Sequence, residues 1–434
     1  MLPAIILFAI TYVLMLIFGK YRPYIALASG VVFIATGMLP IGNVLGELDF
    51  NVLLMIAGTM GLVALFIESK MPALLADLVM EKVPNVMMAA VALSLFAGII
   101  SAFVDNVATV LMVAPVAMEI CKKLKTNPIP FIIGIAVSSN LQGAATLVGD
   151  TTAIMMGSEM NMSFLDFFWY QGKPSIFFAV ELGAVLSALI LAWIFRKSKD
   201  PIPHLGERTK VTDYVPSALL VLLLVLLIGV SFAPDSWNLP AEINGMIAFA
   251  LMIVGLIYAF IKKRKFYAVT EPIKEIDFET LGLLVGLFLM IGGIKHEGVI
   301  DALAKLLADV GGTNLFMLYT VIVWASVIIS AFIDNIPYVA TMIPVIGGLA
   351  TLLSNQMGVD AALVSTPLYF GLLSGATLGG NITPIGASAN ITGIGILRRA
   401  GYEVKNSDFF KIGIPFTLAA IIPAYIYIWL IFGV

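Results

Sequence analysis

The sequence predicts an all-α polytopic membrane protein made of two inverted repeats, and three observations support this. The chain has 434 residues, of which 60% are hydrophobic and 12% charged, with a mean hydropathy of +1.04. A soluble globular domain carries about 25% charged residues. Long apolar runs alternate with short polar connections. Lastly, the stretch Ser101-Ala-Phe-Val-Asp105-Asn106 returns as Ser330-Ala-Phe-Ile-Asp334-Asn335.

Other residue pairs keep nearly the same register as this motif, so the chain is predicted to be a duplicated unit. The first repeat covers residues 1–196 and the second covers 215–434, with a cytoplasmic linker at 197–214. The supporting pairs are Asp49 and Asp277 at an offset of 228, Pro115 and Pro344 at 229, and Thr146 and Thr383 at 237.

A membrane-spanning helix needs about 20 apolar residues. On this basis the sequence predicts ten spans, near residues 2–18, 23–40, 51–67, 129–157, 175–195, 215–232, 241–261, 278–294, 365–396 and 412–432. Two longer tracts, about 86–120 and 314–353, are either pairs of full spans or re-entrant hairpins. The acid and amide in the middle of each tract favour the hairpin. Each repeat then has five spans and one hairpin, and because five is odd, the second repeat is inverted.

The spans at about 129–157 and 365–396 are predicted to be broken helices. Glycines, small hydroxyl residues and Pro384 lie in the middle of these spans, where they disfavour a continuous helix. Unwound backbone at that depth is tolerated only where protein or a water-filled cavity satisfies its polar groups.

Basic residues predict the sidedness, because cytoplasmic loops are enriched in lysine and arginine. Lys20 and Arg22 place the first loop in the cytoplasm, which puts the N-terminus outside. The later basic clusters then fall on the cytoplasmic side as well, at 122–125, 196–210, 262–265 and 398–399. We therefore expect a multi-pass protein of the cell (inner) membrane.

Several function classes are excluded by what the sequence lacks. No Walker loop occurs, which excludes a self-contained ATP-driven pump. No basic stripe suited to nucleic acid is present. We expect a protein that is not an enzyme and has no cofactor apart from a coupling sodium ion or proton, so its energy would come from an ion gradient.

The duplicated Asp-Asn pairs predict a cation site. A charged side chain at bilayer depth costs about 2.5–3.5 kcal/mol and is by default a functional-site hypothesis. Amide and hydroxyl oxygens suit a hard cation such as sodium. Two structural alternatives remain open: each aspartate caps its own turn, and each threonine bonds back to its own helix. The candidate cation ligands are Asp105, Asn106, Thr109, Asn140, Thr146, Gly149, Asp150, Asp334 and Asn335, with Asp105, Asn106, Asp334 and Asn335 as the sodium ligands.

The broken helix of the second repeat predicts a separate substrate site. Its amides have no counterpart in the first repeat, since Asn381 aligns with Ala144 and Asn390 with Ala153. This asymmetry favours a substrate permease over a bare antiporter. The candidate substrate-binding residues are Thr377, Asn381, Thr383, Gly386, Ser388 and Asn390.

These motifs resemble those of the ion transporter superfamily (citrate-transporter-like), in the branch of arsenite permeases, melanosomal P-type proteins and D-type sodium/proton antiporters. The resemblance rests on the stretches 101–109, 139–150 and 379–390 and covers nearly the whole chain. It implies an elevator-like transport domain formed by the hairpins and broken helices, in a homodimer.

Inverted repeats with interrupted helices point to a midplane binding site in secondary transporters. We therefore expect a sodium- or proton-coupled transporter in the lipid bilayer that moves a small anion or polar solute by an elevator-like mechanism. A sodium/proton antiporter, an arsenite efflux permease and a non-transporting membrane receptor are the alternatives.

Overall fold

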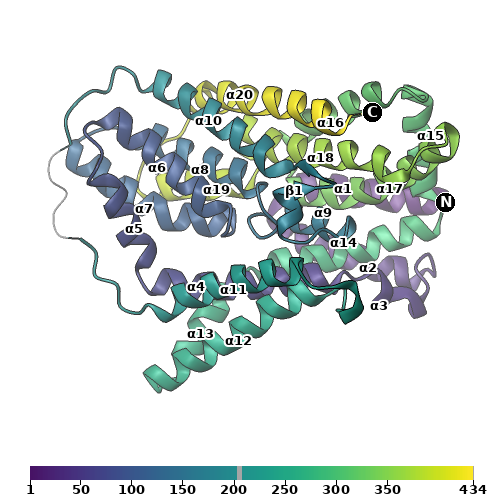
Figure 1. Ribbon diagram of the computed structural model, residues 1–434, viewed down its shortest axis with the longest axis horizontal. Coiled ribbons are helices and arrows are strands. Elements are labelled where there is room, and N and C mark those ends of the chain that lie inside the picture. Colours follow the sequence, from purple (N-terminus) through teal and green to yellow (C-terminus); the bar gives the residue numbers. More distant parts are fainter. Residues whose placement is uncertain (203–207, 434) are drawn as a thin grey trace.

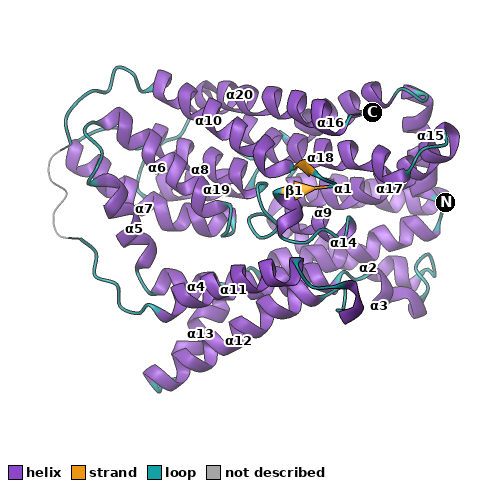
Figure 2. Cartoon of the chain, viewed as in Figure 1, coloured by secondary structure: helices purple, strands orange, loops and turns teal. Residues whose placement is uncertain are grey.

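The structure, a computed structural model, describes residues 1–202 and 208–433. Almost all of its regular structure is helical (Figure 2). The predicted all-α class is therefore confirmed. The centre of the predicted linker, residues 203–207, lies outside the described residues.

The first half of the chain contains ten α-helices and a short antiparallel strand pair among the described residues. In order, the elements are α1 (Leu2–Ile17), η1 (Gly19–Tyr21), α2 (Arg22–Ala35), η2 (Ile41–Asn43), α3 (Val44–Glu47), α4 (Phe50–Glu68), α5 (Met71–Met80), α6 (Val86–Ser101), α7 (Asn106–Leu124), α8 (Ile129–Gly143), α9 (Thr151–Glu159), η3 (Leu165–Phe167), β1 (Trp169–Tyr170), β2 (Lys173–Pro174) and α10 (Ile176–Ile194).

The second half repeats much of this order. Its elements are α11 (Val215–Ser231), η4 (Asp235–Trp237), α12 (Ile243–Lys263), α13 (Tyr267–Lys274), α14 (Phe278–His296), α15 (Val299–Gly311), α16 (Leu315–Ser330), α17 (Asn335–Met357), α18 (Ala361–Gly379), η5 (Gly380–Ile382), α19 (Ser388–Arg399) and α20 (Asn406–Phe432).

Matching elements of the two halves begin in the same way. Asp49 and Asp277 cap α4 and α14, accepting bonds from the backbone N–H of Val52 and Thr280, each at 2.9 Å. In each half a short helix follows, then two helices separated by the Asp-Asn break, then a helix broken at a glycine-rich turn. The recurring sequence motifs therefore lie at recurring places in the helix order.

The helices pack into two groups (Figure 1). In the first helix group, α2 packs on α14, α4 packs on α12, and α11 packs on both α4 and α12. In the second helix group, α6 packs on α8, α16 packs on α18, and α10 packs on α20. Contacts of α4 with α9 and of α14 with α17 join the groups. The interface between the groups is where the site lies.

Helix lengths differ from the predicted spans. Among the described residues, seven helices are long and apolar enough to cross a membrane, or up to nine if two bent pairs each count as one span. These seven include α17, a helix of 23 residues that was predicted to be one arm of a hairpin. By contrast, α1, α2, α8 and α11 have 14 to 17 residues. At 1.5 Å per residue they extend about 21–26 Å, less than the hydrocarbon core of about 30 Å.

The first connection differs from the predicted pair of full spans. Neither α1 nor α2 is by itself long enough to count as a span, and α1 and the η1–α2 segment meet at an angle of 117°. The cytoplasmic side of this connection stays a prediction. The Arg22 side chain is 19% exposed and pairs with Asp334 in the second Asp-Asn break. Arg22 is therefore a largely buried side chain with a carboxylate partner.

Candidate functional site

Both motif aspartates cap helices. Asp105 Oδ1 accepts hydrogen bonds from the backbone N–H of Val107 at 2.9 Å and of Ala108 at 3.2 Å, at the start of α7. Asp334 Oδ1 accepts one from Ile336 N–H at 3.2 Å, at the start of α17. One oxygen of each carboxylate thus stabilises a helix N-terminus, where negative charge is favourable. The cap occupies one oxygen and leaves the other for a second role.

Threonine and glycine join each break to the neighbouring broken helix. The hydroxyl of Thr146 donates to Ala102 O, and that of Thr383 donates to Ala331 O, at matching places in the two halves. Gly149 and Gly386 lie so close to this backbone that a Cβ on Gly149 would be 2.6 Å from Ser101 O. The broken-helix turns and the breaks therefore form two similar compact units.

An amide chain connects the two units. Asn106 Nδ2 donates to Asn140 Oδ1 at 3.3 Å. Asn140 Nδ2 donates to Thr377 O at 2.6 Å and to Asn381 Oδ1 at 3.1 Å. All four residues are buried. Because buried polar groups are costly unless bonded, this chain fixes the two halves against each other.

A small cavity of about 30 Å³ lies where the two breaks, the two broken helices and the first helix group meet. This is about the volume of one water molecule. It is lined by Met60 of α4, Asp277 and Thr280 at the start of α14, Asp105, Asn106 and Val107, Asn140, Asp150 and Thr151, Asn335 and Ile336, and Ser388 and Ala389.

The lining of the cavity is acidic. Asp105, Asp150 and Asp277 all contribute to it, and no lysine or arginine does so among the described residues. Asp150 Oδ2 accepts hydrogen bonds from Thr152 Oγ1 at 2.7 Å and Asn335 Nδ2 at 3.5 Å. Carboxylate and amide oxygens without a basic residue suit a hard cation and repel an anion.

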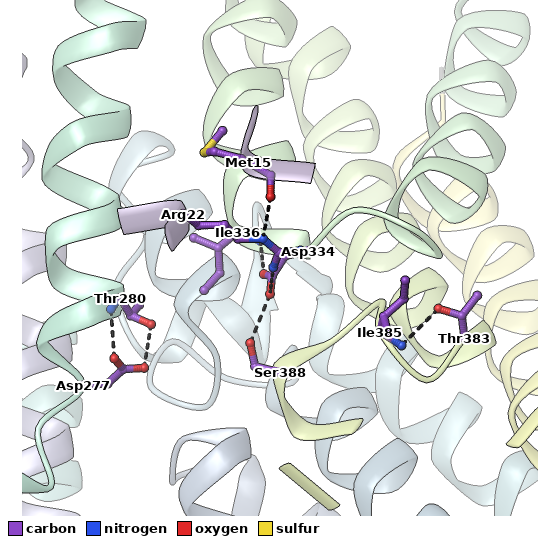
Figure 3. Close-up of polar contacts among 9 residues, drawn as sticks. All are labelled: Met15, Arg22, Asp277, Thr280, Asp334, Ile336, Thr383, Ile385 and Ser388. Atoms are coloured by element: carbon purple, nitrogen blue, oxygen red, sulfur yellow. Dashed lines mark hydrogen bonds and ion pairs between the residues drawn. The ribbon is translucent and has the colours of Figure 1, made fainter. Parts of the chain in front are cut away.

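Asp334 lies beside this cavity and does not line it. Its Oδ2 accepts from Ser388 Oγ at 3.1 Å and pairs with Arg22 Nη1 at 3.4 Å. Figure 3 shows the Arg22 and Ser388 side chains converging on the Asp334 carboxylate, while Asp277 bonds only to Thr280 among the residues drawn. The two motif aspartates thus have the same capping role and different charge environments.

Six predicted site residues come together around the cavity: Asp105, Asn106, Asn140, Asp150, Asn335 and Ser388. The other predicted residues do not line it, and their polar groups are bonded to the protein or packed against its backbone. These are Thr109, Thr146, Gly149, Asp334, Thr377, Asn381, Thr383, Gly386 and Asn390.

Most of the predicted substrate residues hold backbone. Asn381 Nδ2 donates to Val137 O at 2.9 Å. Asn390 Nδ2 donates to Gly380 O at 3.0 Å and to Thr383 O at 3.2 Å. Ser388 is the one member of the predicted substrate set that lines the cavity. Asn390 therefore closes the broken-helix turn of the second half, and Asn381 ties that turn to α8 of the first half.

Sequence reasoning missed two charged residues at or beside the site. Asp277 was recognised only as the register partner of Asp49, and its place before an apolar run indicated a helix cap. Arg22 was read as a marker of a cytoplasmic loop. A usable signal for Arg22 was the shortness of the apolar runs on either side of it. Its partner Asp334, 312 residues away, could not be found from spacing.

One larger hollow adjoins the cavity, and another lies elsewhere along the helices. A groove of about 450 Å³ shares Val107 with the cavity and is also lined by Thr392 and Arg399. A second hollow of about 650 Å³ is formed by the start of α4, the end of α9 and the connection between α11 and α12.

Comparison with known proteins agrees with this architecture. The sequence matches the citrate transporter family over residues 12–368. An uncharacterised transporter of Mycobacterium bovis is 32% identical over 341 residues, covering 78% of this chain and 76% of the relative. The P protein of Mus musculus is 26% identical over 465 residues, covering 91% of this chain and 55% of the P protein.

Solved structures share the fold at low sequence identity. The YdaH transporter of Alcanivorax borkumensis superposes with a TM-score of 0.61 at 15% identity, covering 93% of this chain and 89% of that one. MtrF of Neisseria gonorrhoeae gives 0.55 at 17% identity, covering 93% and 85%. The matched length and the transporter fold lead to one assignment: this chain is a multi-pass membrane transporter of the citrate transporter family.

Proposed function

We propose that the protein is a cation-coupled secondary transporter that moves a small anion or polar solute across the cell membrane. The observation that supports this most directly is the acidic cavity at the interface between the two helix groups. A site at such an interface changes shape whenever the groups move relative to each other. Binding there is therefore linked to conformation.

The coupling ion, sodium or a proton, binds at Asp105 and Asp150. The uncapped oxygen of Asp105, the Asp150 carboxylate and the amides of Asn106, Asn140 and Asn335 supply its oxygen ligands. Two carboxylates that line one small cavity repel each other, and a bound cation removes that repulsion. The second helix group then crosses the membrane with less net charge.

Transport follows from movement of the second helix group past the first. In this elevator-like scheme the two halves are inverted repeats, each Asp-Asn break is the tip of a re-entrant hairpin, and two copies of the chain form a homodimer. The N-terminus lies outside and the described ends of the linker lie in the cytoplasm. The recurrence of Asp105 and Thr146 as Asp334 and Thr383 supports the repeat.

The solute occupies the groove next to the cavity. Val107 lines both spaces, and Arg399 supplies a positive charge in the groove that the cavity lacks. A solute there lies within reach of a cation at Asp105 without entering the acidic cavity. This arrangement suits an anion, in line with the substrate named for the citrate transporter family.

A sodium/proton antiporter is the second candidate, and one observation favours it. The cavity is small, about 30 Å³, and suits an ion or water better than a larger solute. The amides expected to bind a solute, Asn381 and Asn390, are bonded to backbone carbonyls instead. An antiporter would need only one carboxylate-centred site that sodium and protons occupy in turn.

The test is flux in proteoliposomes with the sodium and proton gradients varied separately. Labelled citrate, other small carboxylates and arsenite are offered as solutes. We expect Asp105→Asn and Asp150→Asn each to lower ion-driven flux at least tenfold, because the amide keeps size and capping but cannot carry the charge that holds the ion. Sodium should raise the melting temperature of the wild type and not of these variants, since ligand binding stabilises only the folded state.

Asp360→Asn is the matched control. Asp360 also caps a helix, accepting from Ala362 N–H at 2.8 Å, but it is exposed at the start of α18 and outside the cavity. Its flux should equal that of the wild type. Ion-driven flux that persists in both cavity variants would refute the proposed site. Flux of sodium against protons with no dependence on any solute would select the antiporter.

A further inference from the structure

The two Asp-Asn breaks repeat one motif, yet only one of them has an arginine. Asp334 Oδ2 pairs with Arg22 Nη1 at 3.4 Å, and the side chains are 7% and 19% exposed. Asp105 makes no ion pair among the described residues. The sequence repeat therefore carries two carboxylates, of which the fold neutralises one.

Arg22 is held in place independently of Asp334. It is the first residue of α2, next to the 117° bend, and its Nε donates to Met15 O at 3.3 Å near the end of α1. This second bond orients the guanidinium, as Figure 3 shows for Met15, Arg22 and Asp334. A guanidinium stays charged at all physiological pH values. Because it is part of the chain, the positive charge beside Asp334 cannot dissociate as a bound ion can.

The corresponding place in the second half holds no such charge. The connection between α11 and α12, which follows the same position in the helix order as the α1–α2 bend, contains no lysine or arginine from residue 232 to residue 242. The asymmetry also appears at the cavity. Asp105 lines it, whereas Asp334 is turned to Arg22 and Ser388.

We propose that Arg22 is a resident cation that occupies the second of two duplicated cation sites and so sets the number of exchangeable ions per chain. This inference rests on the proposed cation coupling at Asp105 and Asp150. In it, Arg22 is a positioning and stoichiometry-determining residue, which excludes a second sodium ion from Asp334. Removing its charge while keeping its partner converts Asp334 into a further cation site.

The experiment counts bound ions on the purified full chain with radioactive sodium at equilibrium, at pH 8.5, where an ordinary carboxylate is ionised. The variants are Arg22→Gln, Arg22→Lys, Asp334→Asn and the double variant Arg22→Gln with Asp334→Asn. We expect Arg22→Gln to bind one more sodium ion per chain than the wild type. The double variant, Arg22→Lys and Asp334→Asn should bind the wild-type number.

Lys20→Gln is the matched control, because it removes the same charge two residues away from an exposed position. It should bind the wild-type number of ions. An unchanged number in Arg22→Gln would overturn the inference, as would loss of a sodium ion in Asp334→Asn. If Arg22→Gln does not fold, Asp334→Asn alone decides, since retention of the wild-type number supports the inference and loss refutes it.

Failure of the proposed coupling would look different. In that case the wild type binds no sodium and Asp105→Asn keeps the wild-type ion-driven flux, whereas a proton-coupled protein binds no sodium but loses that flux in Asp105→Asn. The gain of one ion in Arg22→Gln would still support the resident-cation role, because it is measured as a difference between two variants of the same chain.

Discussion

In Asp105 and Asp334, one carboxylate oxygen caps a helix and the other is available for charge interactions. Oδ1 of Asp105 and of Asp334 caps a helix, and the second oxygen decides the charge environment. For Asp334 that oxygen has Arg22 and Ser388 as partners. The hypothesis that these residues are turn caps and the hypothesis that they handle charge are therefore compatible, because each describes a different atom.

The buried asparagines also have two roles: some line the cavity and others bond to backbone carbonyls. Asn106, Asn140 and Asn335 line the cavity, whereas Asn390 donates to carbonyls at the broken-helix turn and Asn381 donates to Val137 O of α8. Unwound backbone inside a membrane has no water to bond to, so the Asn390 amide bonds to it instead.

At the residue scale we predict that Asn390→Ala lowers stability without changing ion selectivity. The substitution leaves the carbonyls of Gly380 and Thr383 unpaired, and each buried unsatisfied group costs about 1–3 kcal/mol. Thermal unfolding in detergent measures the loss, and sodium binding measures selectivity. Asn355→Ala, at an exposed position of α17, serves as control. If the Asn390→Ala variant is as stable as the wild type but has lost solute uptake, the prediction is wrong and Asn390 binds the substrate.

At the scale of elements, the important feature is the close approach between each Asp-Asn break and the broken helix of the same half. A Cβ on Gly386 would be 2.6 Å from Gly380 O and 2.8 Å from Ser330 O. On Gly149 it would be 2.5 Å from Gly143 O. Backbone atoms cannot move aside as a flexible side chain can, so only glycine fits.

We therefore predict that Gly149→Ala and Gly386→Ala each destabilise the protein by about 3 kcal/mol and abolish flux, because the break must separate from the turn. Gly229→Ala is the matched control. Gly229 lies inside α11 with nothing within 4 Å of the added carbon, so alanine there should be neutral or slightly stabilising. Melting temperature and proteoliposome flux are measured together. If either variant is as stable as the wild type, the backbone around that glycine can move aside and the prediction is wrong.

At the scale of the molecule, two helix groups share one acidic interface. Asp277 and Met60 come from the first group, and Asp105 and Asp150 come from the second. The pair of Arg22 and Asp334 crosses the same interface. Relative movement of the groups would change the shape of the cavity, which would link ion occupancy to conformation.

The proposed inverted topology predicts which positions face the same side of the membrane. In a background with Cys121→Ala, single cysteines replace exposed residues at the open ends of the two hairpins. We expect those at Lys82 and Lys122 to react with an impermeant thiol reagent only from the cytoplasm, and those at Thr313 and Asn355 only from outside. Labelling of either pair from both sides, or of all four from one side, would exclude the inverted repeat.

The helical membrane class, the two Asp-Asn breaks and the broken helices could be predicted from the sequence alone. These are local properties, since apolar run length, Gly and Pro placement and a repeated motif act within about 20 residues of chain. The sequence also predicted a site at Asp105, Asn106, Asn140, Asp150, Asn335 and Ser388, and these side chains line one cavity.

The sequence could not show which of those polar groups face a cavity and which form hydrogen bonds to backbone carbonyls, because this depends on the tertiary structure. Asn381 and Asn140 have the same residue type and similar surroundings in sequence, yet one bonds to a carbonyl of α8 and the other also lines the cavity. The partner of Asp334 is an arginine 312 residues away. Hydrogen bonding and charge pairing depend on distances of about 3 Å, and packing between distant helices sets those distances.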